Sequence, residues 1–113
     1  MDAVRKIKVF KSYYKEFYIA QTEAVRKKID YVIELVKCLE VIPTEYFRKI
    51  SDVPGLYEIR VSHKGNIFRI FCCQDKGSLV ILFQGFQKKT QKTPPSEIRK
   101  AVQIMKEYYN STR

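Results

Sequence analysis

Three strand-like segments separated by short glycine turns constrain the fold of this chain more than any other feature. The segments are Leu56–Ser62, Asn66–Cys73 and Ser78–Phe86, and the turns between them are His63–Gly65 and Asp75–Gly77. Turns this short join antiparallel neighbours, because a parallel crossover needs a dozen or more residues. The sequence therefore predicts a three-stranded antiparallel meander.

Helical patterns lie on both sides of the meander. Apolar residues recur at helical spacing in Thr22–Leu39 and again in Pro95–Tyr109. Ile7 and Val9 alternate with lysines and predict a short first strand, while Thr44–Ile50 is interpreted as a helical turn. The expected fold is α+β: a small antiparallel sheet in β-α-β-β-β-α order with helices packed on it.

The positive charge of the chain is unevenly distributed. Lys and Arg number 22 against 12 Asp and Glu, and seven basic residues but only one acid lie between Arg60 and Lys92. Such an excess favours an anionic partner, above all a nucleic acid. No apolar run approaches 18 residues, so no membrane-spanning helix is expected. The length of 113 residues predicts a single domain, residues 1–113.

Cysteine and histidine are too scarce for several kinds of site. Cys38, Cys72 and Cys73 are odd in number, which argues against a disulfide framework and favours a reducing cytoplasm. With His63 as the only histidine and no CxxC pair, we expect no metal and no cofactor. The first residues lack the apolar region of a secretory signal, so we expect a cytoplasmic protein.

A set of basic side chains on the strands and after them indicates phosphate chemistry. Arg69 is the one charge in a segment that is apolar on both faces, so it must reach a carboxylate, a phosphate or water. It can converge with other cations at one edge of the meander. The candidate catalytic residues are Arg60, Arg69, Lys88, Lys89 and Lys92, and Lys64 joins them as a candidate RNA-binding residue.

These residue types suit cleavage of a phosphodiester bond. Arginine grips phosphate with paired hydrogen bonds, and fixed cations stabilise the extra charge of the transition state. A lysine crowded by other cations loses its proton more easily and can act in proton transfer. RNA supplies its own nucleophile, the 2′-hydroxyl, so this chemistry needs no metal.

Each candidate also has an ordinary structural interpretation. Arg69 can pair with Glu58 on the neighbouring strand as an internal ion pair. Glu58 can hold an arginine in place or serve as a general base. The lysines after Phe86 can form a solvated loop, and His63 can be a solvated residue at a hairpin tip.

The chain resembles the RelE/HigB-type toxins of bacterial type II toxin–antitoxin systems, and the HigB branch in particular. The resemblance runs from about Ile7 to Tyr108. Its most specific stretches are GLYEIR at Gly55–Arg60, NIFRIF at Asn66–Phe71 and LFQGFQKKTQKTP at Leu82–Pro94. It implies a toxin that inhibits translation by ribosome-dependent cleavage of mRNA. It also implies neutralisation by a small antitoxin, which we expect to be a helix-turn-helix protein.

The resemblance also implies roles for individual residues. Arg60 and Arg69 match basic positions of the family's sheet, Lys88 and Lys89 match its basic pair, and Lys92 belongs to the lysine-rich motif that follows. Some members use a histidine or a tyrosine near the end of the chain as proton donor. This tail has no histidine, and its Tyr108 and Tyr109 lie on the predicted helix, which leaves the acid unassigned.

Two other functions fit the same residues. The basic surface can be a non-catalytic module that docks on ribosomal RNA, DNA or an acidic antitoxin. Toxins that inhibit DNA gyrase share the fold without ribonuclease activity, so the fold alone does not decide between them.

Overall fold

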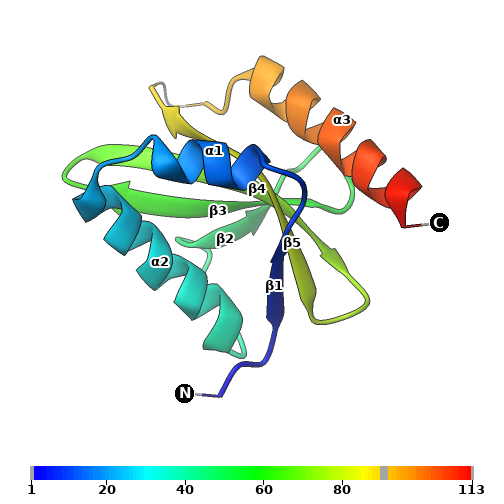
Figure 1. Cartoon of the computed structure of the whole chain (residues 1–113), viewed down its shortest axis with the longest axis horizontal. Coiled ribbons are helices and arrows are strands. Elements are labelled where there is room, and N and C mark those ends of the chain that lie inside the picture. Colours follow the sequence, from blue (N-terminus) through cyan, green and yellow to red (C-terminus); the bar gives the residue numbers. More distant parts are fainter. Residues whose placement is uncertain (1, 90–91, 113) are drawn as a thin grey trace.

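The computed structural model describes residues 2–89 and 92–112 of the chain, which form five strands and three helices (Figure 1). In chain order the elements are β1 (Lys6–Val9), α1 (Tyr13–Ile19), α2 (Glu23–Cys38), β2 (Phe47–Lys49), β3 (Leu56–His63), β4 (Asn66–Asp75), β5 (Leu79–Lys88) and α3 (Pro95–Ser111).

All five strands form one sheet in the order β1-β5-β4-β3-β2. The meander β3-β4-β5 is antiparallel, so this prediction is confirmed, and β4 is its central strand. The α+β class is confirmed as well. The sheet is mixed rather than wholly antiparallel, because β1 pairs with β5 in parallel.

Two elements lie outside the predicted order. The helical turn expected at Thr44–Ile50 is wrong for its second half, because Phe47–Lys49 form edge strand β2 against β3. Only the first half turns, where the amides of Tyr46 and Phe47 donate to the carbonyl of Pro43. Helix α1 is an additional helix of seven residues, too short for a periodic pattern to reveal it.

Helices cover both faces of the sheet, and each face has its own core. Ile59, Ile70 and Leu82 belong to the core beneath α1 and α2, whereas Phe71 and Phe83 belong to the core beneath α3. This split follows from the alternation of side chains along each strand. Because both faces are covered, β4 is buried on both sides, as its near-continuous apolar sequence predicts.

The start of α2 is fixed by a side-chain cap. The hydroxyl of Thr22 accepts a hydrogen bond from the amide of Val25 at 3.3 Å. Replacing Thr22 by alanine is expected to lower the free energy of unfolding by about 1 kcal/mol, because an N-terminal amide of the helix loses its partner. Urea denaturation measures this change, and Thr22→Ser, which keeps the hydroxyl, should unfold close to the parent.

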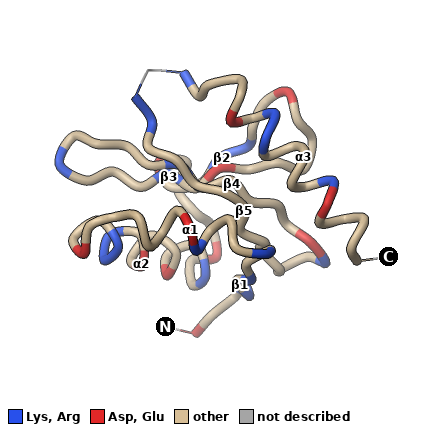
Figure 2. Tube along the Cα trace, turned by 45° about the horizontal axis from the view of Figure 1, so that its top comes forward, with Lys and Arg blue, Asp and Glu red and all other residues tan. Residues whose placement is uncertain are grey.

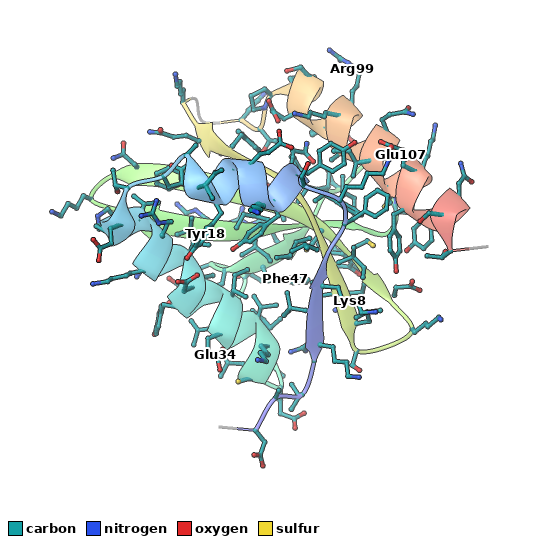
Figure 3. The ribbon with its side chains drawn as sticks, viewed as in Figure 1. Lys8, Tyr18, Glu34, Phe47, Arg99 and Glu107 are labelled. Atoms are coloured by element: carbon teal, nitrogen blue, oxygen red, sulfur yellow. The ribbon has the colours of Figure 1, made fainter. Side chains whose placement is uncertain are left out.

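Polar contacts hold α3 over the sheet. Glu107 (Figure 3) accepts hydrogen bonds from Lys11 at 2.7 Å and from the hydroxyl of Tyr13 at 3.0 Å. Near the other end of α3, the side-chain amide of Gln84 donates a hydrogen bond to the backbone carbonyl of Glu97 at 3.0 Å. The Gln84 contact holds the N-terminal part of α3 beside β5, while the Glu107 contacts hold its C-terminal part beside Lys11 and Tyr13.

A β-bulge in β5 changes which face of the sheet its last residues occupy. Between the pairs Cys72–Leu82 and Ile70–Gly85, β5 advances three residues while β4 advances two. The extra residue reverses the alternation of side chains along β5. As a result Phe86 packs in the core beneath α3, as Phe83 does before the bulge. Lys88, two residues after Phe86, therefore lies on the α3 face.

Gly85 lies at the bulge in close contact with α1. A Cβ atom at this position would lie 2.5 Å from the ring of Phe17. Gly85→Ala is therefore expected to destabilise the protein by roughly 1–3 kcal/mol, as overpacked cores do. Urea denaturation is the measurement, and adding Phe17→Leu should recover part of the loss. No recovery in the double variant would contradict the proposed clash.

None of the helices in the described parts of the chain has the length and apolar content that crossing a membrane requires.

Candidate functional site

A cleft of about 320 Å³ lies on the α3 face of the sheet, where β2, β3, β4 and β5 approach the start of α3. Its lining is rich in cations and contains one carboxylate. The lining residues are Arg48, Lys49, Ile50, Ser51, Glu58, Arg69, Lys88, Lys92, Thr93 and Ile98. In Figure 2 the end of β5 and the residues just before α3 are both basic.

Strand register explains why these side chains meet. Arg48 on β2 pairs directly with Glu58 on β3, and Arg60 on β3 pairs with Arg69 on β4. Directly paired residues of antiparallel strands project from the same face of the sheet. The bulge brings Lys88 to this face as well. Cations from four neighbouring strands therefore share one side of the sheet.

Arg69 and Glu58 form a buried ion pair in the floor of the cleft. A guanidinium nitrogen of Arg69 lies 2.5 Å from Oε1 of Glu58, and each residue is only 4% exposed. The internal pairing considered for Arg69 is therefore confirmed. The pair is incompletely satisfied: Oε2 of Glu58 and Nε of Arg69 have no hydrogen-bond partner among the described residues.

The electrostatics of the cleft disfavour further positive charge. Burial lowers the pKa of Lys88, and the neighbouring Arg69, Arg60 and Arg48 lower it further, while Glu58 opposes them. Burial also lowers the pKa of Arg69, against the attraction of Glu58. A crowded ammonium group of this kind gives up its proton more readily than an ordinary lysine. The cleft can therefore both bind an anion and transfer a proton.

Some of the predicted site residues line the cleft. Arg69, Lys88 and Lys92 line it. Arg60 is not among the lining residues, although it lies on the same face and its charge acts on Lys88. Lys92 is exposed and lies just before the N-terminus of α3. Three of the five candidate catalytic residues thus border one cavity.

The other candidates lie around the cleft or away from it. Lys89 is exposed just beyond β5, and Lys64 is exposed in the β3–β4 hairpin turn, where its φ is 48°. Neither lines the cleft. His63, half-buried, is the last residue of β3 before that turn. Thr90 and Gln91 of the lysine-rich motif lie outside the described residues.

Arg48 and Lys49 are cleft residues that sequence reasoning missed. Both were assigned to a helical turn, which gave no reason to place them beside Glu58. The signal that could have found them is the pair of strand-favouring aromatic residues Tyr46 and Phe47 shortly before a turn cluster, which is compatible with a short edge strand.

The tail tyrosines serve to anchor α3. Tyr108 donates a hydrogen bond to Asp75 at 2.7 Å, and Asp75 ends β4 opposite Leu79, whereas Lys88 is at the other end of β5. Burial raises the pKa of Tyr109 to about 12, and its hydrogen bond to Cys73 adds to the increase. Neither tyrosine lines the cleft.

The described residues contain no cluster of three or more His, Cys, Asp or Glu side chains suited to hold a metal ion. Cys38, Cys72 and Cys73 are all buried. Burial raises the pKa of Cys72 well above its ordinary value, so this thiol is held in its neutral form.

Comparison with known proteins identifies a family for most of the chain. No curated protein matches the chain. The model of a protein family described as "Phage derived protein Gp49-like (DUF891)" matches residues 16–106. The matched range extends from α1 into α3 and contains every residue that lines the cleft. Since the match covers most of its length, the chain belongs to the Gp49-like (DUF891) family, a RelE/ParE-type toxin family.

Proposed function

We propose that this protein is the toxin of a type II toxin–antitoxin system and cleaves mRNA on the ribosome. The observation that carries the proposal is one cleft in which Arg48, Arg69, Lys88 and Lys92 surround the single carboxylate of Glu58. This combination suits a bound phosphate with an acid and a base beside it. The LFQGFQKKTQKTP segment supports placement in the HigB branch.

The cations of the cleft bind the scissile phosphate. Arg69 is held rigidly by Glu58, and Arg48 approaches from the edge strand. Preorganised donors stabilise the charge that develops on the phosphoryl oxygens, since they need not reorient during the reaction. Arg60 adds positive potential from the neighbouring position on β3, while Lys64, Lys89 and Lys92 contact the RNA chain on either side.

Proton transfer is assigned to Lys88 and Glu58. The 2′-oxygen attacks the adjacent phosphorus, and the carboxylate of Glu58, which lines the cleft, accepts the 2′-hydroxyl proton. The bond from phosphorus to the 5′-oxygen breaks, and the ammonium group of Lys88 donates a proton to that oxygen. The products are a 2′,3′-cyclic phosphate and a 5′-hydroxyl. The lowered pKa of Lys88 supports its role as the acid.

A protein partner follows from the family. Gp49-like toxins typically pair with a helix-turn-helix antitoxin. We propose that such an antitoxin neutralises this protein in the cytoplasm, where the ribosomes and their mRNA are found.

The test is to map mRNA ends after a short induction of the protein. Cut ends within translated regions, with growth arrest, are the expected result. Intact mRNA together with inhibited DNA supercoiling would select gyrase inhibition instead. Salt-sensitive binding to ribosomes without cleavage would select a non-catalytic module, since phosphate contacts weaken steeply with salt.

The pH dependence of cleavage is a further prediction. If Lys88 is the acid, it must be protonated, so the rate should fall as the pH rises through its pKa. That pKa lies below the ordinary lysine value of 10.5. Single-turnover cleavage of ribosome-bound message at increasing pH measures the decline. A variant with Lys88→Arg, which stays protonated throughout, should lack it.

A further inference from the structure

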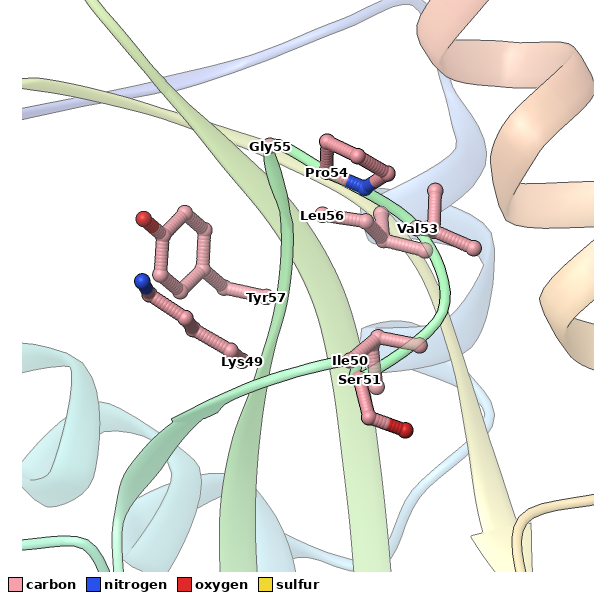
Figure 4. Close-up of a pocket in the computed structure, with 8 residues that line it drawn as sticks. All are labelled: Lys49, Ile50, Ser51, Val53, Pro54, Gly55, Leu56 and Tyr57. Atoms are coloured by element: carbon pink, nitrogen blue, oxygen red, sulfur yellow. The ribbon is translucent and has the colours of Figure 1, made fainter.

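A second cavity, of about 300 Å³, lies in the connection between β2 and β3 (Figure 4). Its lining combines apolar side chains with polar ends. The lining includes Lys49, Ser51, Val53, Pro54, Leu56 and Tyr57. In Figure 4 the amine of Lys49 and the hydroxyl of Tyr57 point the same way, while Val53 and Pro54 lie along the loop.

The cavity adjoins the cationic cleft. Lys49, Ile50 and Ser51 line both of them, so the two share one wall at the end of β2. A ligand whose anionic group lies between Arg48 and Lys88 can therefore reach into the cavity with its neighbouring part.

The connection that forms the cavity is closed by its own hydrogen bonds. The amide of Ile50 donates to the carbonyl of Leu56 at 2.9 Å. Inside this loop the amide of Val53 donates to Ile50, and that of Leu56 to Val53, both at 3.2 Å. Gly55, with a φ of 85°, permits the last turn. A loop braced in this way keeps its shape before a ligand binds, which lowers the cost of binding.

We infer that the cavity between β2 and β3 binds the nucleobase of the nucleotide whose phosphate lies in the adjoining cleft. The inference rests on the proposed function and names a subsite for it. A nucleobase has apolar faces and a polar edge, which match a lining that combines the apolar side chains of Val53 and Pro54 with the polar ends of Lys49 and Tyr57. The ribose joins the phosphate to the base, and it would lie at the wall that the two cavities share.

The experiment compares ligands that differ only by the base. Calorimetry measures binding of inorganic phosphate and of 3′- and 5′-ribonucleoside monophosphates carrying each of the four bases. We expect nucleotides of at least one series to bind fivefold or more tightly than inorganic phosphate, since a stacked base contributes about 1–3 kcal/mol. Val53→Trp fills the cavity and should remove this gain while leaving the affinity for inorganic phosphate unchanged.

Val41→Trp is the matched control, because Val41 is 85% exposed and lines neither cavity. It should keep the gain from the base. If Val53→Trp lowers the melting temperature, Pro54→Trp, at an exposed position that lines this cavity but not the cleft, provides the same test. Equal affinity for nucleotides and inorganic phosphate overturns the inference, as does a gain that persists in both folded variants.

The outcomes separate this inference from the proposed function. The parent protein can show a gain in affinity from the base, which Val53→Trp removes, and yet cleave no ribosome-bound message. That result supports the subsite and refutes the ribonuclease. Cleavage without a gain from the base supports the ribonuclease and refutes the subsite.

Discussion

Replacing Lys88 by methionine is expected to lower the rate of mRNA cleavage by about 10²–10⁴-fold, the usual contribution of a positioned general acid. Methionine keeps much of the side-chain length but cannot donate a proton to the leaving 5′-oxygen. Lys88 is only partly buried, so the fold should persist. Single-turnover cleavage of ribosome-bound message measures the loss, with the products separated by length.

The control for Lys88→Met is the same substitution at Lys100, an exposed lysine on α3 that does not line the cleft. Lys100→Met removes the same charge and should stay within a few-fold of the parent. Lys89→Met should have an effect between the two, because Lys89 acts on the RNA chain rather than on the leaving group. An equal loss in all three variants would mean that net charge, not proton transfer, drives cleavage.

The second large effect concerns stability. Arg69→Ala leaves the carboxylate of Glu58 buried without its partner, and breaking one side of a buried ion pair costs about 3–5 kcal/mol. That is a large part of the stability of a small domain, which is roughly 5–15 kcal/mol. We expect the midpoint of urea denaturation to fall sharply. A variant that unfolds at the same urea concentration as the parent would show that Glu58 remains solvated or becomes protonated at little cost.

This instability complicates a growth assay of Arg69→Ala, because an unfolded toxin also allows growth. The double variant Glu58→Leu/Arg69→Met avoids the difficulty. Replacing both members of a buried pair by apolar residues is often neutral or stabilising, so its unfolding midpoint should return close to the parent value. It should still fail to cleave mRNA, since it lacks both the phosphate ligand and the proton acceptor. Cleavage by the folded double variant would exclude this pair from the reaction.

The central part of the fold could be predicted because its determinants are local. Alternating apolar residues and turns with glycine fix the meander, and the apolar surroundings of Arg69 require a partner for its charge. Sequence reasoning left carboxylate, phosphate and water open for that partner. The register, which pairs Glu58 with Phe71 and Arg60 with Arg69, brings Glu58 within reach of Arg69.

The features that could not be predicted depend on contacts distant in sequence. Strand β2 has three residues and exists only because β3 offers an edge, so Arg48 could not be placed in advance. The bulge in β5 lies where Gly85 packs against Phe17, a residue far away in the sequence. Counting residues along an uninterrupted strand would put Lys88 on the α1 and α2 face, away from Arg69.

The parallel pairing of β1 with β5 also has a consequence for synthesis of the protein. The first strand pairs only with the last, so Ile7 cannot pair until Val80 has emerged from the ribosome. Pairing of such distant segments is slow, because a long loop must close first. Lys92 and Thr93 are needed to complete the cleft and come later still. The cationic cleft is therefore incomplete while most of the chain is still being translated. Under the proposed function, a nascent chain could not yet cleave mRNA on the ribosome that makes it.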